Sequence, residues 1–258
     1  MTRVAVLTYH SIDRTGSVLS VSPEEFRSHV EAIARSGREV VAPSRLASSL
    51  TGSPPVRDGA FALTFDDGYA GVAEHAAPIL EAHGFPYALF LVTSRVGLSN
   101  DWPSQPSWVP RAPLLGWDAL AALTAKGAEI GAHTRDHADL TLLPETGIRD
   151  QLESSAGEIR RRLGIDPRLF AYPGGRSSPA IRGAAASLFS ASFSTRHARM
   201  TEADDRSDLP RVETFYFRDP RRFGRLFSAS LDLRLAARRG LRAAGRVSRR
   251  GRTLRWSA

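Results

Sequence analysis

Two adjacent acidic residues, Asp66 and Asp67, follow the apolar run 61–65 in the stretch "FALTFDDG". Neighbouring carboxylates repel each other, so the pair is costly unless a cation or hydrogen bonds compensate for the charge. Successive strand residues point to opposite sides, but a turn at Gly68 can bring both carboxylates to the same site at the end of the strand. The alternative is an Asp-Gly turn with two solvated acids, and the dipeptide alone does not exclude it.

Two histidines, His133 and His137, lie four residues apart in "HTRDH", directly after the strand-like "EIGA". This spacing can place both imidazoles on one face of a turn, as a zinc site requires. Because the chain has seven histidines, two exposed loop histidines are the alternative. Together with one strand-end aspartate, the pair would form a set of two histidines and one carboxylate, which leaves coordination positions open for water and a substrate oxygen.

Strand-like and helix-like runs alternate along the chain. The pattern predicts strands at 4–10, 39–42, 61–67, 87–93, 129–134, 169–173 and 189–195, and helices at 22–37, 71–84, 117–127 and 144–164. Such alternation is typical of parallel strands joined by helices, in an α/β doubly wound sheet or a barrel. In both architectures the active groups lie at the carboxyl ends of the strands.

The chemistry-bearing residues share that position. His10, the Asp66–Asp67 pair, the two histidines and the segment 172–174 each lie at the C-terminal end of a predicted strand. One such placement is weak evidence, but several indicate a single rim.

Composition narrows the class of protein. The chain has 258 residues, 42% hydrophobic and 24% charged, which fits one large α/β domain or two small ones. It has no cysteine, which excludes disulfides and thiolate metal sites. No apolar run approaches the roughly 18 residues of a transmembrane helix, and the stretch Val4–Tyr9 is too short for the core of a signal peptide. We therefore expect a cytoplasmic protein.

Positive charge gathers at the C-terminus. From Arg218 onward there are 13 arginines and two aspartates, a net charge of +11, so the preceding residues carry −3. We therefore predict a catalytic domain over 1–218 and a basic helix and tail over 219–258. The tail could touch an anionic membrane surface or be merely solvated. It has no nucleic-acid recognition motif, so no specific nucleic-acid partner is expected.

These motifs resemble the polysaccharide deacetylases, the NodB-homology family that includes carbohydrate esterase family 4. The matching text is "TFDDG", "WDALAALTAKGAEIGAHTRDHADLTLL" and "RRLGIDPRLFAYPGG", and the resemblance covers roughly residues 3–215. It implies a distorted (β/α) barrel of seven to eight parallel strands. It also implies a divalent metal, most often Zn²⁺, and hydrolysis of N-acetyl, sometimes O-acetyl, groups on sugars.

The resemblance also implies roles for individual residues. Asp67, His133 and His137 would hold the metal, and Asp66 would be the general base. The segment "YPGG" matches the family's third motif, so Tyr172, Pro173 and Gly174 would line the substrate site, with the Gly174 N–H stabilising the oxyanion. Without its neighbours, this segment would be a simple type II turn.

The chain departs from the family pattern at three places. Ala171 stands where the third motif usually carries an arginine, and Arg211 in "DLPRVET" is a candidate to pair with Asp66 instead. Gly174 replaces the commoner tyrosine. No late "L-x-H" block follows residue 180, whereas "VAVLTYHSI" at the N-terminus has its character, so His10 is the predicted general acid and His197 the next candidate.

A long loop, 94–116, follows one strand on the same rim and contains Trp102 and Trp108. Long connections without secondary structure are often functional. The two indoles could stack on sugar rings, or they could pin the loop to the barrel.

We expect a metal-dependent hydrolase that removes N-acetyl groups from an amino-sugar polysaccharide or glycolipid precursor. Two alternatives remain at this stage: hydrolysis of another C–N bond, as in a cyclic amide or ureide, and a non-catalytic carbohydrate-binding barrel.

Overall fold

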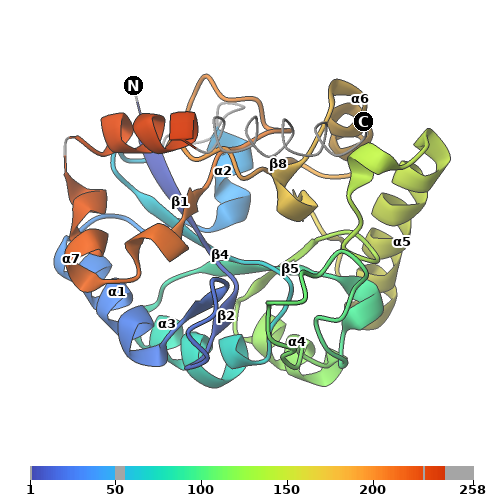
Figure 1. The fold of residues 1–258 in the computed structure, drawn as a ribbon, viewed down its shortest axis with the longest axis horizontal. Helices are drawn as coiled ribbons and strands as arrows, with labels where there is room; N and C mark the ends of the chain where they lie inside the picture. The colour runs from blue at the N-terminus through green and yellow to red at the C-terminus, as the bar shows by residue number, and fades with distance from the viewer. Residues whose placement is uncertain (1, 50–55, 229, 242–258) are drawn as a thin grey trace, which may run out of the picture.

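A computed structural model describes residues 2–49, 56–228 and 230–241 (Figure 1). The main strands are β1 (Arg3–Tyr9), β4 (Phe61–Phe65), β5 (Tyr87–Leu91), β6 (Glu129–Ala132), β7 (Leu169–Ala171), β8 (Ala191–Phe193) and β10 (Val212–Glu213); shorter ones are β2 (Ser11–Ile12), β3 (Ser20–Val21) and β9 (Met200–Thr201). The α-helices are α1 (Pro23–Arg35), α2 (Pro43–Ser49), α3 (Ala77–His83), α4 (Trp117–Ala125), α5 (Glu145–Leu163), α6 (Pro179–Ala186) and α7 (Pro220–Phe223).

The main sheet has the order β10-β1-β4-β5-β6-β7-β8 with parallel pairing throughout, and β9 adds an antiparallel pair to β1. Its two edges meet at a parallel bridge between Phe193 and Leu209. Two hydrogen bonds support this bridge, from Ser194 N to Leu209 O (2.9 Å) and from Leu209 N to Ser192 O (2.8 Å). The prediction of a distorted barrel is therefore confirmed, and β1 lies between the last strand and β4.

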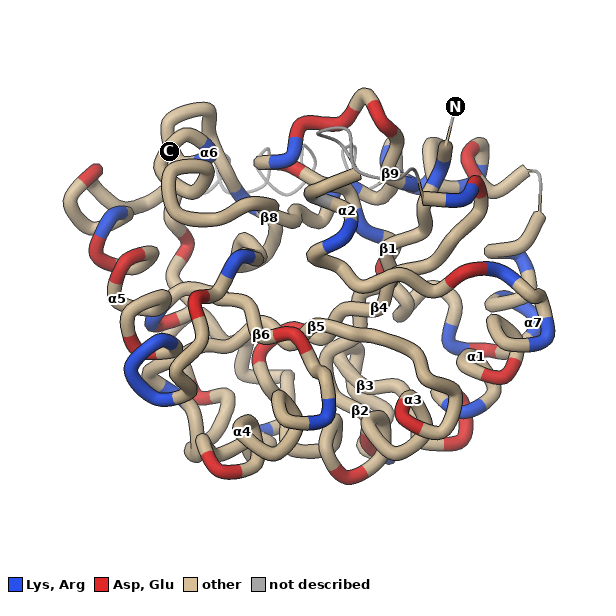
Figure 2. The backbone as a smooth tube through the Cα atoms, turned by 180° about the vertical axis from the view of Figure 1, so that it is seen from behind, with Lys and Arg blue, Asp and Glu red and all other residues tan. Residues whose placement is uncertain are grey.

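Alternation along the strands separates two cores. Ala5 and Leu7 of β1 pack outward with Phe26 of α1, whereas Val4 and Val6 belong to a second apolar cluster inside the barrel. Figure 2 shows few charges along the strands and charges of both signs over the surrounding helices and loops. Strands buried on both faces are typical of parallel sheets covered by helices.

The helix boundaries follow local signals in the sequence. Ser22 caps α1 by accepting the Glu25 N–H, while the Glu25 side chain accepts the Ser22 N–H. Gly164 ends α5 with φ of 69°, a conformation that favours glycine. Two predictions need correction. The segment 39–42 contributes only a bridge at Val40, and the helix predicted over 71–84 begins as a π-helical turn, Val72–Ala76.

The segment after residue 218 packs on the barrel. Phe223 and Leu226 are buried in the outer core, and so is Leu231 in the helical stretch 231–241. Asp232 pairs with Arg3 at 3.0 Å, which places this stretch beside the N-terminus (Figure 1). Residues 242–258 of the predicted tail lie outside the described residues, and the boundary at 218 stays a prediction. Within the described ranges, no helix is long and apolar enough to cross a bilayer.

A buried histidine couples the outer core to pH. His29 Nδ1 lies 3.2 Å from Tyr9 Oη, its Nε2 lies 2.8 Å from Arg218 O, and its ring stacks on Phe223. Burial lowers the pKa of His29 to about 4. An unfolded histidine titrates near 6.5, so the neutral ring's stabilising contribution is fully present above that pH and declines as the pH falls toward 4.

We predict that the free energy of unfolding falls by up to about 3 kcal/mol between pH 6.5 and 4 because of His29. His29→Gln, which does not titrate in this range, should lose less stability over the same interval. Urea denaturation of both proteins at several pH values measures the difference. Parallel pH profiles would contradict the assignment.

Candidate active site

Strand alternation directs three polar side chains into the mouth of the barrel. His10 lies four residues after the inward-facing Val6, and Asp66 lies four residues after the inward-facing Ala62. His133 follows Gly131, where an added Cβ would meet the inward Phe90 ring at 2.6 Å. Because side chains alternate along a strand, His10, Asp66 and His133 point to the same interior face.

Asp67, His133 and His137 form a compact ligand set. One ligand atom from each lies within 4.8 Å of the others, and Asp67 Oδ1 is 3.5 Å from Nε2 of both histidines. Zinc with bonds of about 2.0 Å in tetrahedral geometry separates neighbouring ligand atoms by about 3.3 Å. The spacing of this set therefore suits such a cation.

The chemistry of the set also fits a cation. Asp67 Oδ1 is buried and has no hydrogen-bond partner among the described residues, an arrangement that is costly unless an ion compensates. Burial raises the pKa of Asp67, and the neighbouring Asp66 adds to this, while His10 and His133 act in the opposite direction. Burial also lowers the pKa of His137 well below its usual value, which favours the neutral, ligating ring.

Backbone geometry at the ligands is unusual. Asp67, Thr134 and His137 have φ of 72°, 66° and 55°, and they are the non-glycine residues with positive φ in the described part of the chain. Such conformations carry strain and cluster where a side chain must be aimed. His133 is aimed differently, because its Nδ1 donates to Ala171 O at 2.7 Å and leaves Nε2 facing Asp67.

Asp66 has a different partner from its neighbour. The Arg211 guanidinium binds both of its carboxylate oxygens, at 2.6 and 2.7 Å, and Arg211 is only 2% exposed. Arg211 also donates to Ser194 O at 3.2 Å, and its guanidinium lies about 6 Å from the ring centroids of both Phe90 and Phe193. Burial alone would raise the pKa of Asp66, but the Arg211 charge, aided by His133 and His10, holds it well below its usual range.

His10 faces the mouth of the barrel. Its side chain is 17% exposed, and its Nε2 lies 4.0 Å from Asp66 Oδ2. His197, by contrast, is buried and its Nδ1 accepts the Glu213 N–H. The predicted role of His10 as general acid stays a prediction, but its placement is compatible with that role.

The third motif supplies backbone, not side chains, to the rim. The Tyr172 ring is fully buried and its hydroxyl donates to Ser207 O at 2.8 Å, and Pro173 is buried as well. Both side chains pack into the barrel wall, so only the backbone of this segment faces the rim, and its role at the substrate site stays a prediction. Gly174 is exposed with φ of 61°, and a Cβ there would meet no atom within 4 Å.

The two loop tryptophans have different environments. Trp102 is 2% exposed and stacks on the His137 ring at 4.5 Å, which fits the alternative that it pins the loop to the barrel. Its contact with a sugar stays a prediction. Trp108 is 66% exposed and can contact a ligand. Sequence reasoning missed Ser104, whose hydroxyl contacts His137, because nothing in the loop's spacing points to that contact.

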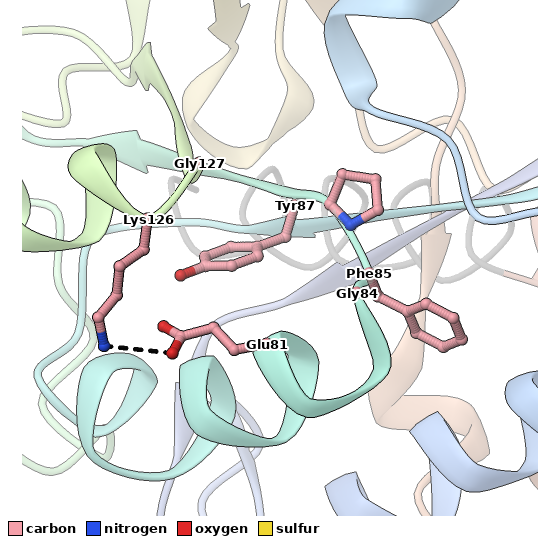
Figure 3. A pocket seen from close by; sticks show the side chains of 7 residues that line it. Glu81, Gly84, Phe85, Tyr87, Lys126 and Gly127 are labelled. Atoms are coloured by element: carbon pink, nitrogen blue, oxygen red, sulfur yellow. Dashed lines mark hydrogen bonds and ion pairs between the residues drawn. The ribbon is translucent and has the colours of Figure 1, made fainter.

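A separate hollow of about 460 Å³ lies at the opposite end of the barrel (Figure 3). It is lined by Phe85, Tyr87 and a Lys126–Glu81 ion pair of 3.2 Å, among others. These residues precede or begin β5 and β6, so the hollow lies away from the strand ends that carry the predicted site.

The family model for polysaccharide deacetylases matches residues 53–189. The chain belongs to the polysaccharide deacetylase family. This match includes Asp66, Asp67, both ligand-set histidines and Gly174, whereas His10 and Arg211 lie outside it.

Two curated proteins match part of this chain. The Bacillus subtilis (strain 168) protein named "Putative polysaccharide deacetylase YxkH" is 24% identical over 174 residues, which cover 67% of this chain and 57% of that protein. A chitin deacetylase of Pestalotiopsis sp is 29% identical over 113 residues, covering 44% of this chain and 33% of that protein. The chain thus spans less than two thirds of either relative.

Solved structures share the polysaccharide deacetylase fold. IcaB from Ammonifex degensii superposes with a TM-score of 0.75 at 22% identity, covering 88% of this chain and 98% of that one. The Streptococcus pyogenes deacetylase PplD, solved in complex with acetate, gives 0.74 at 19% identity, covering 88% and 99%. At these identities the likeness supports the barrel fold alone.

We predict that Arg211→Ala destabilises this deacetylase-family protein by about 3–5 kcal/mol, because it leaves the Asp66 carboxylate buried without its partner. Adding Asp66→Asn to Arg211→Ala should recover part of the loss by removing the unpaired charge. Urea denaturation at pH 7 gives both values. A single-variant cost below about 1 kcal/mol, as for an exposed ion pair, would contradict the prediction.

Proposed function

We propose that this chain is a metal-dependent hydrolase that removes N-acetyl groups from an amino-sugar-containing polysaccharide or glycolipid precursor. One observation carries the proposal: an Arg211-bound, ionised Asp66 lies directly beside the Asp67–His133–His137 set, on one rim. The set suits cation binding and leaves Asp66 free for proton transfer. Family membership supports a hydrolytic deacetylase, and the names of relatives such as the chitin deacetylase support an acetylated sugar as substrate.

Asp67, His133 and His137 would hold the metal, which we propose is Zn²⁺ because histidine nitrogens and a carboxylate oxygen suit that ion. When bound, such an ion polarises a substrate carbonyl and lowers the pKa of water to about 7.

Asp66 accepts the proton of the attacking water. Its two oxygens are fixed by the Arg211 guanidinium at 2.6 and 2.7 Å, and a carboxylate oxygen keeps a further lone pair for a water molecule. Because Arg211 holds Asp66 ionised, the base is ready over the whole neutral range. Its basicity is correspondingly low, which would suit a water molecule whose own pKa a bound cation had lowered.

His10 donates a proton to the departing amine. Its Nε2 is 4.0 Å from Asp66 Oδ2, so acid and base lie within the width of one reacting group. The exposed Gly174 leaves room for the sugar beside the carbonyl, and its N–H is the proposed oxyanion donor. The exposed Trp108 offers an apolar face to a neighbouring sugar.

Substitutions of Asp66 and Asp67 should have different effects on zinc binding and turnover. Asp67→Ala should lose both bound zinc and activity, whereas Asp66→Asn should keep zinc and lose turnover by 10²-fold or more, roughly the value of one general base. Metal content after dialysis and acetate release from acetylated chito-oligosaccharides, with and without chelator, measure the two effects. Wild-type turnover in Asp66→Asn would refute the base assignment. Chelator-sensitive hydrolysis of a cyclic amide without acetate release would favour the alternative C–N bond.

His10 can be tested through the leaving group. His10→Gln should lower kcat on an N-acetyl sugar by roughly 10²–10⁴-fold, but it should affect an activated aryl acetate much less, because a phenolate leaves without protonation. His83→Gln, at the exposed end of α3, is the matched control and should leave both rates unchanged. Equal losses on the amide and the aryl ester in His10→Gln would contradict the assignment.

A further inference from the structure

The loop 94–116 contacts the predicted metal ligand His137 through two side chains, Ser104 and Trp102. We infer that both are positioning residues, which hold the His137 imidazole in the tautomer and orientation that ligation requires. This inference rests on the proposed metal site. It adds that the metal affinity of the site depends on a loop outside the two motifs that contain the ligands.

The Ser104 hydroxyl sets the tautomer. Its oxygen lies 3.1 Å from His137 O and 3.3 Å from His137 Nδ1. A carbonyl oxygen can only accept, so the hydroxyl proton goes to His137 O and its lone pairs face the ring. Nδ1 must then carry the hydrogen of the second bond. The unprotonated nitrogen is Nε2, the atom that lies 3.5 Å from Asp67 Oδ1.

Trp102 fixes the plane of the ring. The indole and the imidazole stack with centroids 4.5 Å apart and planes 27° apart, and the indole is almost wholly buried. His137 itself has a backbone φ of 55°, which residues other than glycine rarely adopt. The intrinsic backbone preference of a histidine therefore does not favour the conformation seen at His137. We infer that contacts from the loop 94–116 hold the residue in it.

The loop is anchored to the other side of the same ligand set. The Asn100 side-chain amide donates to Tyr69 Oη and to Pro110 O, both at 3.0 Å, and Asn100 Oδ1 accepts the Ala112 N–H at 2.7 Å. Leu115 N donates to Gly68 O at 2.8 Å. Gly68 and Tyr69 directly follow Asp67 in the chain. The loop thus contacts both the turn that follows Asp67 and the His137 ring. Hydrogen bonds from the buried Asn100 side chain stabilise the fold of the loop itself.

His133 provides the internal comparison. Its tautomer is set by a backbone acceptor, Ala171 O, at 2.7 Å, which no side-chain substitution removes. His137 depends on a side chain that can be changed. Partners of this kind typically change metal affinity by 10- to 100-fold when removed.

The test measures zinc binding by the full-length chain, using competition with a chromophoric chelator. Ser104→Ala should weaken zinc binding by about 10- to 100-fold, and Ser104→Thr, which keeps the hydroxyl, should restore most of it. Ser107→Ala, on an exposed serine of the same loop, is the control and should bind zinc like the wild type.

A second readout reports on the tautomer itself. In zinc-free protein, ¹⁵N spectra of the imidazoles should show His137 protonated at Nδ1, and Ser104→Ala should shift it toward a mixture, while His133 stays unchanged. Trp102→Leu should weaken zinc binding more than Trp102→Phe, which retains an aromatic face. This pair keeps the inference testable if Ser104→Ala fails to fold.

Wild-type zinc affinity in Ser104→Ala, or equal losses in Ser104→Ala and Ser107→Ala, would overturn the inference while leaving the proposed function intact. A wild-type chain that binds no zinc would overturn both.

Discussion

The bidentate ion pair between Arg211 and Asp66 is the constraint on which the site depends. Both groups are buried at the mouth of the barrel, where an unpaired charge would be expensive. Asp66 directly follows β4, whereas Arg211 precedes β10, in the segment that closes the barrel between β8 and β1. The pair therefore joins barrel closure to the ionisation of the proposed base. The guanidinium packs beside the rings of Phe90 and Phe193, so the apolar interior also supports its position.

The same constraint divides two adjacent carboxylates between two roles. Arg211 lowers the pKa of Asp66, whereas burial raises that of Asp67, whose Oδ1 has no hydrogen-bond partner within the described residues. Groups whose environments push their pKa values apart are typical of acid–base and ligand assignments in active sites. A cation at Asp67 would stabilise its carboxylate, and the two histidine nitrogens beside it could complete a site for one. The repulsion expected of an Asp-Asp pair would then be relieved separately at each residue, by Arg211 at Asp66 and by the cation at Asp67.

Much of this arrangement can be predicted from residue types and strand periodicity. The placement of His10 and Asp66 at the carboxyl ends of predicted strands indicates that they share one rim, and capping signals predict α1 and the end of α5. Strand periodicity does not predict the direction of side chains that lie outside the strands. Tyr172 and Trp102 have the chemistry of substrate contacts, but their rings pack inward because the barrel wall and the His137 ring bury more of their surface. The contacts from Ser104 and Asn100 depend on how a long loop folds back, and no local pattern encodes that path. The predicted membrane contact of the tail finds no support in the described residues, and the cytoplasmic location stays a prediction.

We propose that Asp67 is a metal ligand, whereas Arg211 keeps Asp66 out of the coordination sphere. A crystal structure of the zinc-soaked protein, with anomalous data at the zinc edge, tests it most directly. We expect one strong peak about 2.0–2.2 Å from Asp67 Oδ1 and from Nε2 of both His133 and His137, with the Asp66–Arg211 pair intact. Zinc bound to Asp66, with the arginine pair broken, or no zinc at this rim would contradict it.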